Sequence, residues 1–382
     1  MADRSYQLFF ADQAAEDEFY PQVLEVTVEN DADRADSFRI KLGLQLQDDG
    51  SWSSVDNTRF ALFTKVRIEA GFKDGNTEVL TEGYITDVGI HFEDPAGQPY
   101  LELRGLDASV LMSLEEKIVA WPNLSDSDIA TQILSGYGLT PDVTSTNPVH
   151  QEADTTVIQR GTDLQFLRQL ARKNGFEVGV EKDFTSGQLT GYFRPPALNG
   201  TPQKTLAVAC GSDSSLKSFD VRLDGLKPLD VEAGQIDVKA KSAQSGTASS
   251  MQLSPIGRQD LGALVSGPIG SLATPKVAAG KLWLHASPTS DTAELGAMAQ
   301  AVRDEASWLA TASGEIISDV YAAVLRAKRL VLVKGAGTLY SGKYYVIRVV
   351  HRLTSDGRYE QSFQAKRNAI GLDGSENFSN GL

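Results

Sequence analysis

Residues 159–176 read QRGTDLQFLRQLARKNGF, and this stretch contains a complete helix with its start and stop signals. Thr162 followed three residues later by Gln165 is the capping-box pattern, in which each side chain bonds the other residue's backbone N–H. Gly175 is able to adopt the left-handed conformation that ends many helices. The apolar residues recur at intervals of three and four and form one face: Leu164, Leu167, Leu170 and Ala171. The stretch predicts a capped amphipathic helix, followed by a strand at residues 176–180.

A second capped helix is predicted before this one. Ser125-Asp126-Ser127-Asp128 supplies a capping side chain and acidic residues for the first turn. Gly136 and Gly138 end the helical pattern. Its apolar face consists of Ile129, Ile133 and Leu134. Two helices packed on a short sheet predict a small α+β domain over residues 113–195.

The residues before this domain follow a different periodicity, in which apolar and polar side chains alternate. Alternation of period two, interrupted by Asp, Asn and Gly, is typical of antiparallel strands. Such runs occur at residues 23–29, 38–42, 66–70, 84–92 and 100–106. The sequence therefore predicts a first antiparallel β domain, a sheet or barrel, over residues 1–112.

Strand patterns return after the α+β domain and again near the end of the chain. They occupy residues 204–240 and 329–366, with Ser355-Asp356-Gly357 as a hairpin turn in the second region. These runs predict further β structure on both sides of a segment that has another character.

Residues 241–312 are predicted as a linker and a helical insertion. Residues 242–250 are small and polar, which predicts a loop or linker, and residues 267–280 are rich in Gly and Pro, which predicts irregular structure. A long helix with Asp291 as its N-cap is expected to follow. Its apolar stripe consists of Leu295, Met298, Ala299, Val302, Ala306 and Leu309.

The composition excludes several classes of partner. With 36 Lys and Arg against 50 Asp and Glu, the net charge is −14, which disfavours binding to nucleic acid and to anionic membranes. The sequence has no signal peptide and no apolar run of membrane-spanning length, so we expect no membrane insertion. Its one cysteine, Cys210, fits folding in a reducing cytoplasm. Because Cys210 ends an apolar run predicted as a strand, we expect a buried, inert thiol.

A search for reactive groups finds no convergent set. The four histidines are His91, His150, His285 and His351, and none lies three to five residues from another, so no local zinc-binding pair exists. The short Gly335-Ala336-Gly337 motif predicts a turn, because no following helix is predicted that would bind a phosphate at its N-terminus. We therefore predict no metal and no cofactor.

The remaining candidates for catalysis or binding have simpler structural interpretations. The acidic pairs Glu115-Glu116 and Asp304-Glu305 are expected on solvated faces, although paired carboxylates also serve as general acid and base. His351, close in sequence to Arg348 and Arg352, is interpreted as a structural histidine. The tryptophans of Trp121-Pro122 and Trp283 are expected in the core, with interface anchors as the alternative. The sequence thus predicts no catalytic residues and no enzyme.

Two further segments have a recognisable pattern. Gly105-Leu106-Asp107-Ala108 with Leu111 closes the first β domain, and residues 339–352 read LYSGKYYVIRVVHR. The second pattern continues through Gly357, Phe363 and Arg367-Asn368-Ala369-Ile370. Together with residues 159–176, and in the same order, these segments resemble the phage late-control protein D family and the VgrG proteins of contractile injection systems.

The resemblance implies a mainly β fold with an α+β insertion: two β-barrel, tube-like domains and a small α/β domain. The first barrel is expected over residues 1–112, and the second, discontinuous, over residues 196–240 and 313–382. It also implies a structural baseplate hub, a homotrimer that joins the hexameric ring of an inner tube protein to a trimeric spike, beside other baseplate subunits. Since the chain ends at Leu382, a separate spike protein is expected. Such a hub assembles in the cytoplasm and becomes part of a phage tail or injection particle. Residues 325–329 occupy the place of a Pro-Gly turn in the family, which leaves the barrel geometry there open.

Two other functions remain open from the sequence. One is a tail-associated cell-wall hydrolase, which would use a carboxylate pair such as Glu115-Glu116. The other is a β-rich receptor-binding tail module, which would present exposed aromatic residues on loops. The sequence also leaves open whether the particle is a phage tail, an extracellular injector or a type VI-like system.

Overall fold

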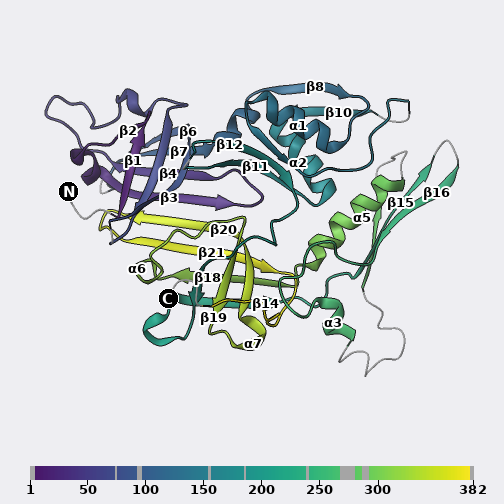
Figure 1. Cartoon of the computed structure of the whole chain (residues 1–382). Helices are drawn as coiled ribbons and strands as arrows, with labels where there is room; N and C mark the ends of the chain where they lie inside the picture. The colour runs from purple at the N-terminus through teal and green to yellow at the C-terminus, as the bar shows by residue number, and fades with distance from the viewer. Residues whose placement is uncertain are drawn as a thin grey trace.

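Most strands of the protein belong to one large sheet. The computed structural model describes residues 5–73, 75–92, 97–153, 156–184, 186–237, 241–266, 280–285 and 292–378. The main sheet has 13 strands, and two insertions carrying helices lie beside it (Figure 1). The prediction of a mainly β fold with an α+β insertion is confirmed.

The main sheet consists of two units. The first unit contains β1 (Tyr6–Phe10), β3 (Val23–Asp31), β4 (Ser37–Gly43), β5 (Lys65–Gly71), β6 (Thr77–His91) and β7 (Tyr100–Asp107), with the short β2 (Gln13–Ala14) at its edge. The second unit contains β13 (Gln203–Ala207), β14 (Leu216–Leu223), β18 (Ala310–Ile316), β19 (Arg329–Lys334), β20 (Gly342–Thr354) and β21 (Tyr359–Arg367).

The two units have the same strand connectivity. Neighbouring strands in the first unit follow the order β1-β5-β6-β7-β4-β3, and those in the second follow β13-β19-β20-β21-β18-β14. In sequence order the strands therefore correspond one to one, from β1 with β13 to β7 with β21. All corresponding pairs are antiparallel except that β13 and β19 run parallel, whereas β1 and β5 run antiparallel. The chain thus contains a structural repeat that its sequence does not reveal.

Irregularities of the ladders support this correspondence. The register shifts between Ile85 and Asp87 in the β6–β7 pair, and between Val346 and Arg348 in the β20–β21 pair. A second matching shift lies early in β3, in its pairing with β4, and early in β14, in its pairing with β18. Extra residues in a strand alter its twist and direction, so matching shifts give both units the same bend.

Phe63 and Lys328 show the same correspondence in the backbone. Their φ angles are 63° and 64°, in the left-handed region that side chains rarely adopt. The N–H of Phe63 donates to the carbonyl of Ile85, and that of Lys328 to the carbonyl of Val346, each at 2.7 Å. The turn at residues 325–329, which the sequence left open, therefore has the same backbone conformation as its counterpart at Phe63. Lys328 adopts there a conformation that glycine adopts without strain.

The units are joined edge to edge by β3 and β20, which pair antiparallel from Arg348↔Asp31 to Thr354↔Glu25. The expected closed barrels do not occur among the described strands, because the strands of the two units form one open sheet. The physical reason is that β3 uses its second edge to bind β20 rather than to close its own unit.

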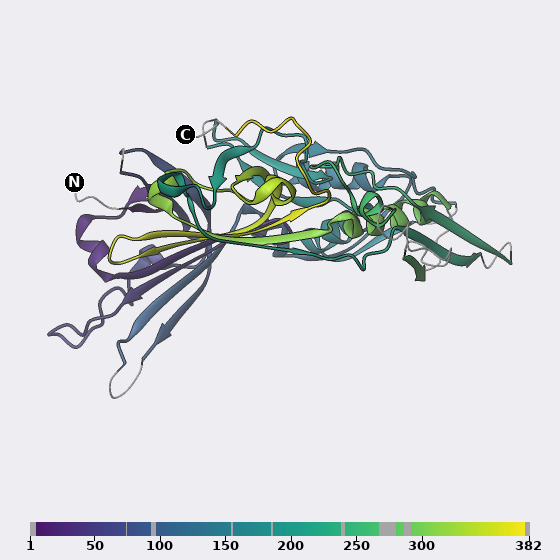
Figure 2. The same cartoon turned by 90° about the horizontal axis from the view of Figure 1, so that it is seen from below.

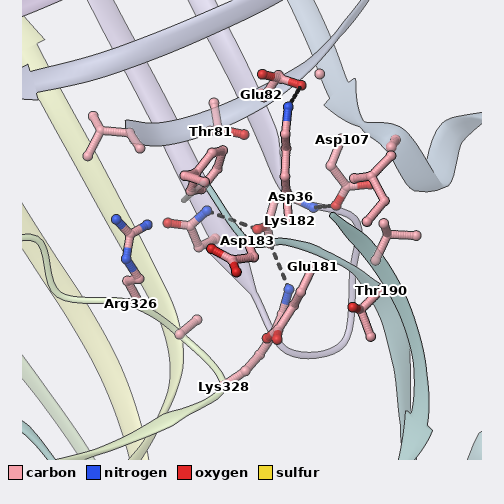
Figure 3. A pocket seen from close by; sticks show the side chains of 18 of the residues that line it. Asp36, Thr81, Glu82, Asp107, Glu181, Lys182, Asp183, Thr190, Arg326 and Lys328 are labelled. Carbon is pink, nitrogen blue, oxygen red and sulfur yellow. Dashed lines mark hydrogen bonds and ion pairs between the residues drawn. The ribbon is translucent and has the colours of Figure 1, made fainter. Parts of the chain in front are cut away.

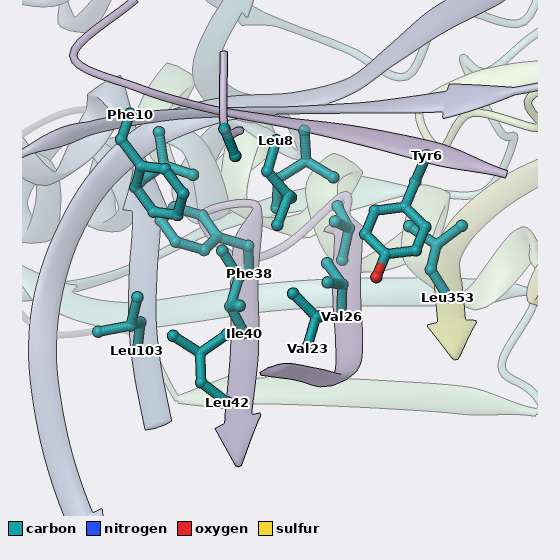
Figure 4. Packing of buried hydrophobic residues seen from close by; sticks show 14 of the residues in the cluster. Tyr6, Leu8, Phe10, Val23, Val26, Phe38, Ile40, Leu42, Leu103 and Leu353 are labelled. Carbon is teal, nitrogen blue, oxygen red and sulfur yellow. The ribbon is translucent and has the colours of Figure 1, made fainter. Parts of the chain in front are cut away.

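Each unit curves around its own apolar core. In the first unit the inward side chains of the strands pack together, and Leu353 of β20 joins them at the seam (Figure 4). The second core is lined by alternating residues of its strands, including Leu206, Val331, Tyr344 and Phe363. Burial of apolar area at about 25 cal/mol per Å² is the main stabilising contribution to such cores.

The α+β insertion lies between β7 and β13. Its elements are β8 (Glu116–Trp121), α1 (Asp126–Gly136), β9 (Thr140–Val143), β10 (Val157–Thr162), α2 (Asp163–Asn174), β11 (Glu177–Lys182) and β12 (Leu189–Arg194). Ser125 and Thr162 cap the two helices, each in a complete capping box, and Gly175 ends α2 at φ 68°. Both helices and the strand after α2 are confirmed.

A second insertion separates β14 from β18. It contains β15 (Asp230–Asp237), β16 (Ser242–Ala248), α3 (Leu261–Ser266), β17 (Lys281–His285) and α5 (Thr292–Ser307). The prediction of a loop at residues 242–250 is wrong, because β16 pairs with β15 and α5 covers their face. Small residues are required there: a Cβ on Gly246 would lie 2.2 Å from the Gly296 nitrogen. Residues 267–279 and Asp291 lie outside the described residues.

Short helices complete the structure. They are η1 (Asp17–Gln22), η2 (Thr58–Phe60), η3 (Ala108–Ser113), η4 (Gly211–Asp213), α6 (Ser318–Tyr321) and α7 (Gly337–Tyr340). The turn predicted at Gly335-Ala336-Gly337 is present, with positive φ at both glycines. It is followed by the single turn of α7, which the sequence did not predict.

Candidate functional site

The described residues surround a polar cavity of about 460 Å³, here called the junction pocket, where three parts of the chain meet (Figure 3). The first unit contributes the end of β3, the β3–β4 turn and β6. The α+β insertion contributes β11 and β12, and the second unit contributes residues 326–329, just before and at the start of β19. Charged groups from distant positions are therefore brought together at this seam.

Lys328 is the central cation of the junction pocket. It is almost fully buried, and its Nζ lies 3.1 Å from Asp36 Oδ1. Burial by itself lowers the pKa of Lys328, but the negative charges beside it, first that of Asp36, outweigh burial and hold the pKa well above its usual value. Lys328 is thus charged at all physiological pH values and bridges the second unit to the first.

Asp36 connects Lys328 to a wider network. Its carboxylate accepts bonds from Asn30 Nδ2 and the Asp31 backbone N–H, both at 3.0 Å. Its own N–H donates to Asp107 Oδ2 at 2.7 Å, and Asp107 Oδ1 accepts from the Ser109 N–H at 2.8 Å. Burial, together with the charge of Asp36, raises the pKa of Asp107. Two carboxylates held close together in this way are stabilised by the charge of Lys328 beside them.

His351 extends the same network into the seam between β3 and β20. Its ring lies fully buried, with Nε2 3.1 Å from Asn30 Oδ1 and Nδ1 2.9 Å from the Tyr359 hydroxyl. Burial, and then the charge of Arg326, lower the pKa of His351 to about 3. Both ring nitrogens are engaged within the protein, so the interpretation as a structural histidine is confirmed.

This pKa predicts a pH effect on stability. Below its ordinary pKa of 6.5, His351 takes up a proton in the unfolded chain but not in the folded protein, so stability falls as the pH drops from 6.5 towards 3. Between pH 7 and pH 5 the loss at this residue amounts to about 2 kcal/mol. We expect that loss to disappear in His351→Gln, whose amide still bonds its neighbours.

The measurement is urea unfolding of both proteins at pH 7 and pH 5, comparing the two differences in free energy. The comparison cancels the contribution of other titrating groups to the pH dependence. One such group is Glu177, because burial raises the pKa of its carboxyl to about 7 although the hydrogen bond from Tyr345 opposes this shift. An equal pH dependence in the two proteins would contradict the prediction.

Ion pairs also line the rim of the junction pocket. Lys182 and Lys65 both pair with Glu82, and Arg194 of β12 pairs with Asp142 of β9. The Lys182–Glu82 pair ties β11 of the insertion to β6 of the first unit. Within the described ranges, no group of three or more His, Cys, Asp or Glu side chains is placed to hold a metal ion. The Lys328–Asp36 and Lys182–Glu82 pairs therefore join different parts of the chain across this pocket.

The acidic pairs expected on solvated faces lie in different surroundings. Glu115 and Glu116 are exposed, outside the junction pocket, as predicted. Asp304, however, is buried, and its Oδ1 accepts the Gln252 backbone N–H at 2.7 Å. The prediction for Asp304 is wrong because an isolated helix gives no sign that the residue-252 segment crosses its polar face. Glu305 pairs on the surface with Lys366.

Three aromatic and thiol predictions have mixed outcomes. The prediction of a buried Cys210 thiol at the end of a strand is wrong. Cys210 is half-buried and lies beyond β13, because Ala209 has φ 53° and turns the chain out of the strand. Trp121 packs against the core of the α+β insertion, and its Nε1 donates to Gln159 Oε1 at 3.2 Å, as expected. Trp283 on β17 is 64% exposed, so its prediction as a core residue is wrong.

The other histidines have separate positions. His150 is buried against Asp126, with 3.1 Å between Nε2 and Oδ1, whereas His91 stacks on Tyr100 near the end of β6. His285 is exposed at the end of β17. Sequence reasoning missed the residues that build the joint, above all Lys328 and Asp36, which are 292 positions apart. No local pattern signals a contact over that separation.

The fold agrees with those of solved tail and injection proteins. The 43 kDa tail protein of prophage MuSo2 from Shewanella oneidensis has a TM-score of 0.64 at 11% identity, over 96% of this chain and 100% of that one. A type VI secretion component of E. coli, described as similar to the T4 tail proteins gp27 and gp5, scores 0.54 at 12% identity, over 94% and 76%. A chain of the Francisella PdpA–VgrG complex scores 0.54 at 10% identity, over 97% and 53%.

The protein therefore has the fold of phage-tail and VgrG-like baseplate components. By sequence, residues 10–355 match the family described as the Alg8 N-terminal domain, and the chain belongs to that family. No curated protein matches the sequence. None of the described helices is long and apolar enough to cross a membrane.

Proposed function

We propose that the protein is the structural hub of a baseplate in a phage tail or contractile injection system. As a homotrimer it adapts the hexameric ring of an inner tube protein to a trimeric spike. The observation that carries this proposal is the repeat of two units with the same connectivity and the same ladder irregularities. Three copies present six similar units to a six-fold partner while keeping three-fold symmetry for the spike.

The joint between the two units is suited to a protein that transmits force. The β3–β20 ladder makes the two units one sheet, and the Lys328–Asp36 bridge and the His351 network lie beside it. Buried polar networks of this kind fix one geometry when all members are satisfied. A ring that transmits force from tube to spike needs that fixed geometry between its units.

The proposed organisation assigns a role to each part of the chain. The two β domains that face the tube are residues 1–112 and residues 196–223 with 310–382, where the expected bounds at 240 and 313 move to the end of β14 and the start of β18. Residues 113–195 are an α+β domain, and the insertion between β14 and β18 is an arm beside them. The partners are the tube ring, the spike and other baseplate subunits, without nucleic acid, in a particle assembled in the cytoplasm. The hub performs no catalysis, and the charged pairs of the junction pocket serve its rigidity.

The test is co-expression with candidate tube and spike proteins from the same genomic neighbourhood. We expect a complex with three copies of the chain by native mass spectrometry and a six-fold tube ring stacked on it in negative-stain images. An unrelated hexameric tube protein serves as the control. A chain that remains monomeric and binds neither protein would refute the hub function.

A further inference from the structure

Within the chain, the two units are joined by β3 and β20. Their counterparts in the repeat are β14 and the end of β6, and both of these leave one edge of the main sheet free. β14, the counterpart of β3, is a terminal strand of the sheet path, and β18 is its one partner among the described strands. The last residues of β6, from Asp87 to His91, pair with β7 on one side, while β5 ends its pairing at Tyr84. Their counterparts in β20 are the residues that pair with β3.

We propose that β14 of one copy pairs antiparallel with the end of β6 of the next copy, as β3 pairs with β20 within the chain. This inference rests on the proposed trimeric hub and names the contact that closes it. Because the two edges differ, the contact is head to tail, and its repetition closes a ring. Exposed strand edges are ready templates for such pairing.

The register follows from the matching ladder shifts. Ile85 corresponds to Val346, so Asp87 corresponds to Arg348 and Val88 to Val349. The early shift aligns Val23 of β3 with Leu216 of β14. Counting onward from there gives the remaining equivalences: Val28 with Val221, Glu29 with Arg222 and Asn30 with Leu223. Since Val349 lies opposite Asn30 within the chain, Val88 is placed opposite Leu223 of the next copy.

Exposure supports these positions. Val349 and Asn30, at the internal joint, are 0% and 7% exposed, whereas Val88 and Leu223 are 37% and 38% exposed. Ile90, the counterpart of the fully buried His351, is also exposed. Figure 2 shows the β6–β7 hairpin extending away from the body of the protein, where a second copy has access to it. Apolar side chains of this size on free strand edges are typical of surfaces that become buried in assemblies.

Charge supports the same register. At the internal joint, Arg348 pairs with Glu29 at 2.8 Å. Their counterparts, Asp87 and Arg222, carry the opposite charges at the same two positions. Both are exposed, and no ion pair within the described residues engages either one. The same register places Asp87 directly opposite Asp224, the counterpart of Asp31. Arg222 lies at the neighbouring position on the same face, so the external joint offers one arginine to two carboxylates, with the polarity of the internal Arg348–Glu29 pair reversed.

The test is a charge-reversal cycle measured by native mass spectrometry and light scattering. Arg222→Asp gathers three carboxylates at the joint, those of Asp87, Asp224 and the new aspartate, and we expect it to weaken trimer formation at least about tenfold. The double variant D87R/R222D restores opposite charges, and we expect it to recover trimers. Arg160→Asp, on an exposed strand of the α+β insertion, is the matched control and leaves association unchanged.

Cysteine cross-linking tests the register without altering charge. In a Cys210→Ser background, V88C/L223C is expected to form disulfide-linked dimers and trimers on oxidation, whereas either single variant forms no such ladder. A trimeric wild type with no effect of the charge variants and no cross-link would overturn the strand pairing and leave the hub intact. A wild type that is monomeric alone and with tube and spike proteins would overturn both.

Discussion

Replacing Arg367 by methionine is expected to lower the free energy of unfolding by about 3–5 kcal/mol. Arg367 ends β21 and is fully buried. Its guanidinium donates to the carbonyls of Ser341 at 2.9 Å and Gly371 at 2.8 Å, and it lies over the Tyr344 ring. Methionine fills much of the volume but leaves these carbonyls without donors, and a buried unpaired polar group costs about 1–3 kcal/mol.

The measurement for Arg367→Met is urea unfolding followed by circular dichroism. Arg352→Met is the matched control, because Arg352 pairs with Glu25 on the surface and exposed pairs contribute about 0–1 kcal/mol. If both variants lost the same free energy of unfolding, the buried contacts of Arg367 would contribute no more to stability than an exposed ion pair.

Replacing Lys328 by methionine is expected to have a similar effect, about 3–5 kcal/mol, but with a dependence on pH. The change leaves Asp36 and Asp107 next to each other without the cation between the units. Burial and the charge of Asp36 already raise the pKa of Asp107, and loss of Lys328 raises it further. Because a carboxyl with a raised pKa favours the folded state at low pH, the destabilisation is larger at pH 8 than at pH 5.

Unfolding of Lys328→Met at both pH values checks this prediction. Lys73→Met, which removes a surface partner of Asp319, should change stability by less than about 1 kcal/mol at either pH. The double variant K328M/D36N removes one of the two carboxylate charges, and we expect it to be more stable than K328M. A double variant less stable than K328M at pH 8 would contradict the electrostatic explanation.

The elements predicted correctly from the sequence are those whose signals are local. The caps of α1 and α2 lie within three residues of their partners, and Gly175 ends α2 by its own conformational freedom. The alternating runs predicted the strands of the first unit for the same reason. β16 was missed because its small polar residues carry no strand pattern, and its place depends on packing under α5.

The repeat was invisible in the sequence because corresponding positions hold different chemistry. Phe63 corresponds to Lys328, Asp87 to Arg348 and, by the same register, Asp107 to Arg367. Each side chain bonds the backbone just after the last strand of its unit: Asp107 accepts from the Ser109 N–H, and Arg367 donates to the Gly371 carbonyl. Backbone geometry preserved the relationship where side-chain identity did not.

The sequence by itself determined the class of the fold, the capped helices, the acidic surface and the resemblance to a tail hub. Only the tertiary structure decided that the two β regions share one connectivity, join as one open sheet and leave two matching edges free. The physical reason is the range of the interactions: caps and alternation act within a few residues, whereas strand pairing and buried ion pairs join residues up to hundreds of positions apart. The exposure of Val88 and Leu223 becomes informative only when it is compared with the burial of their counterparts, Val349 and Asn30, at the internal joint.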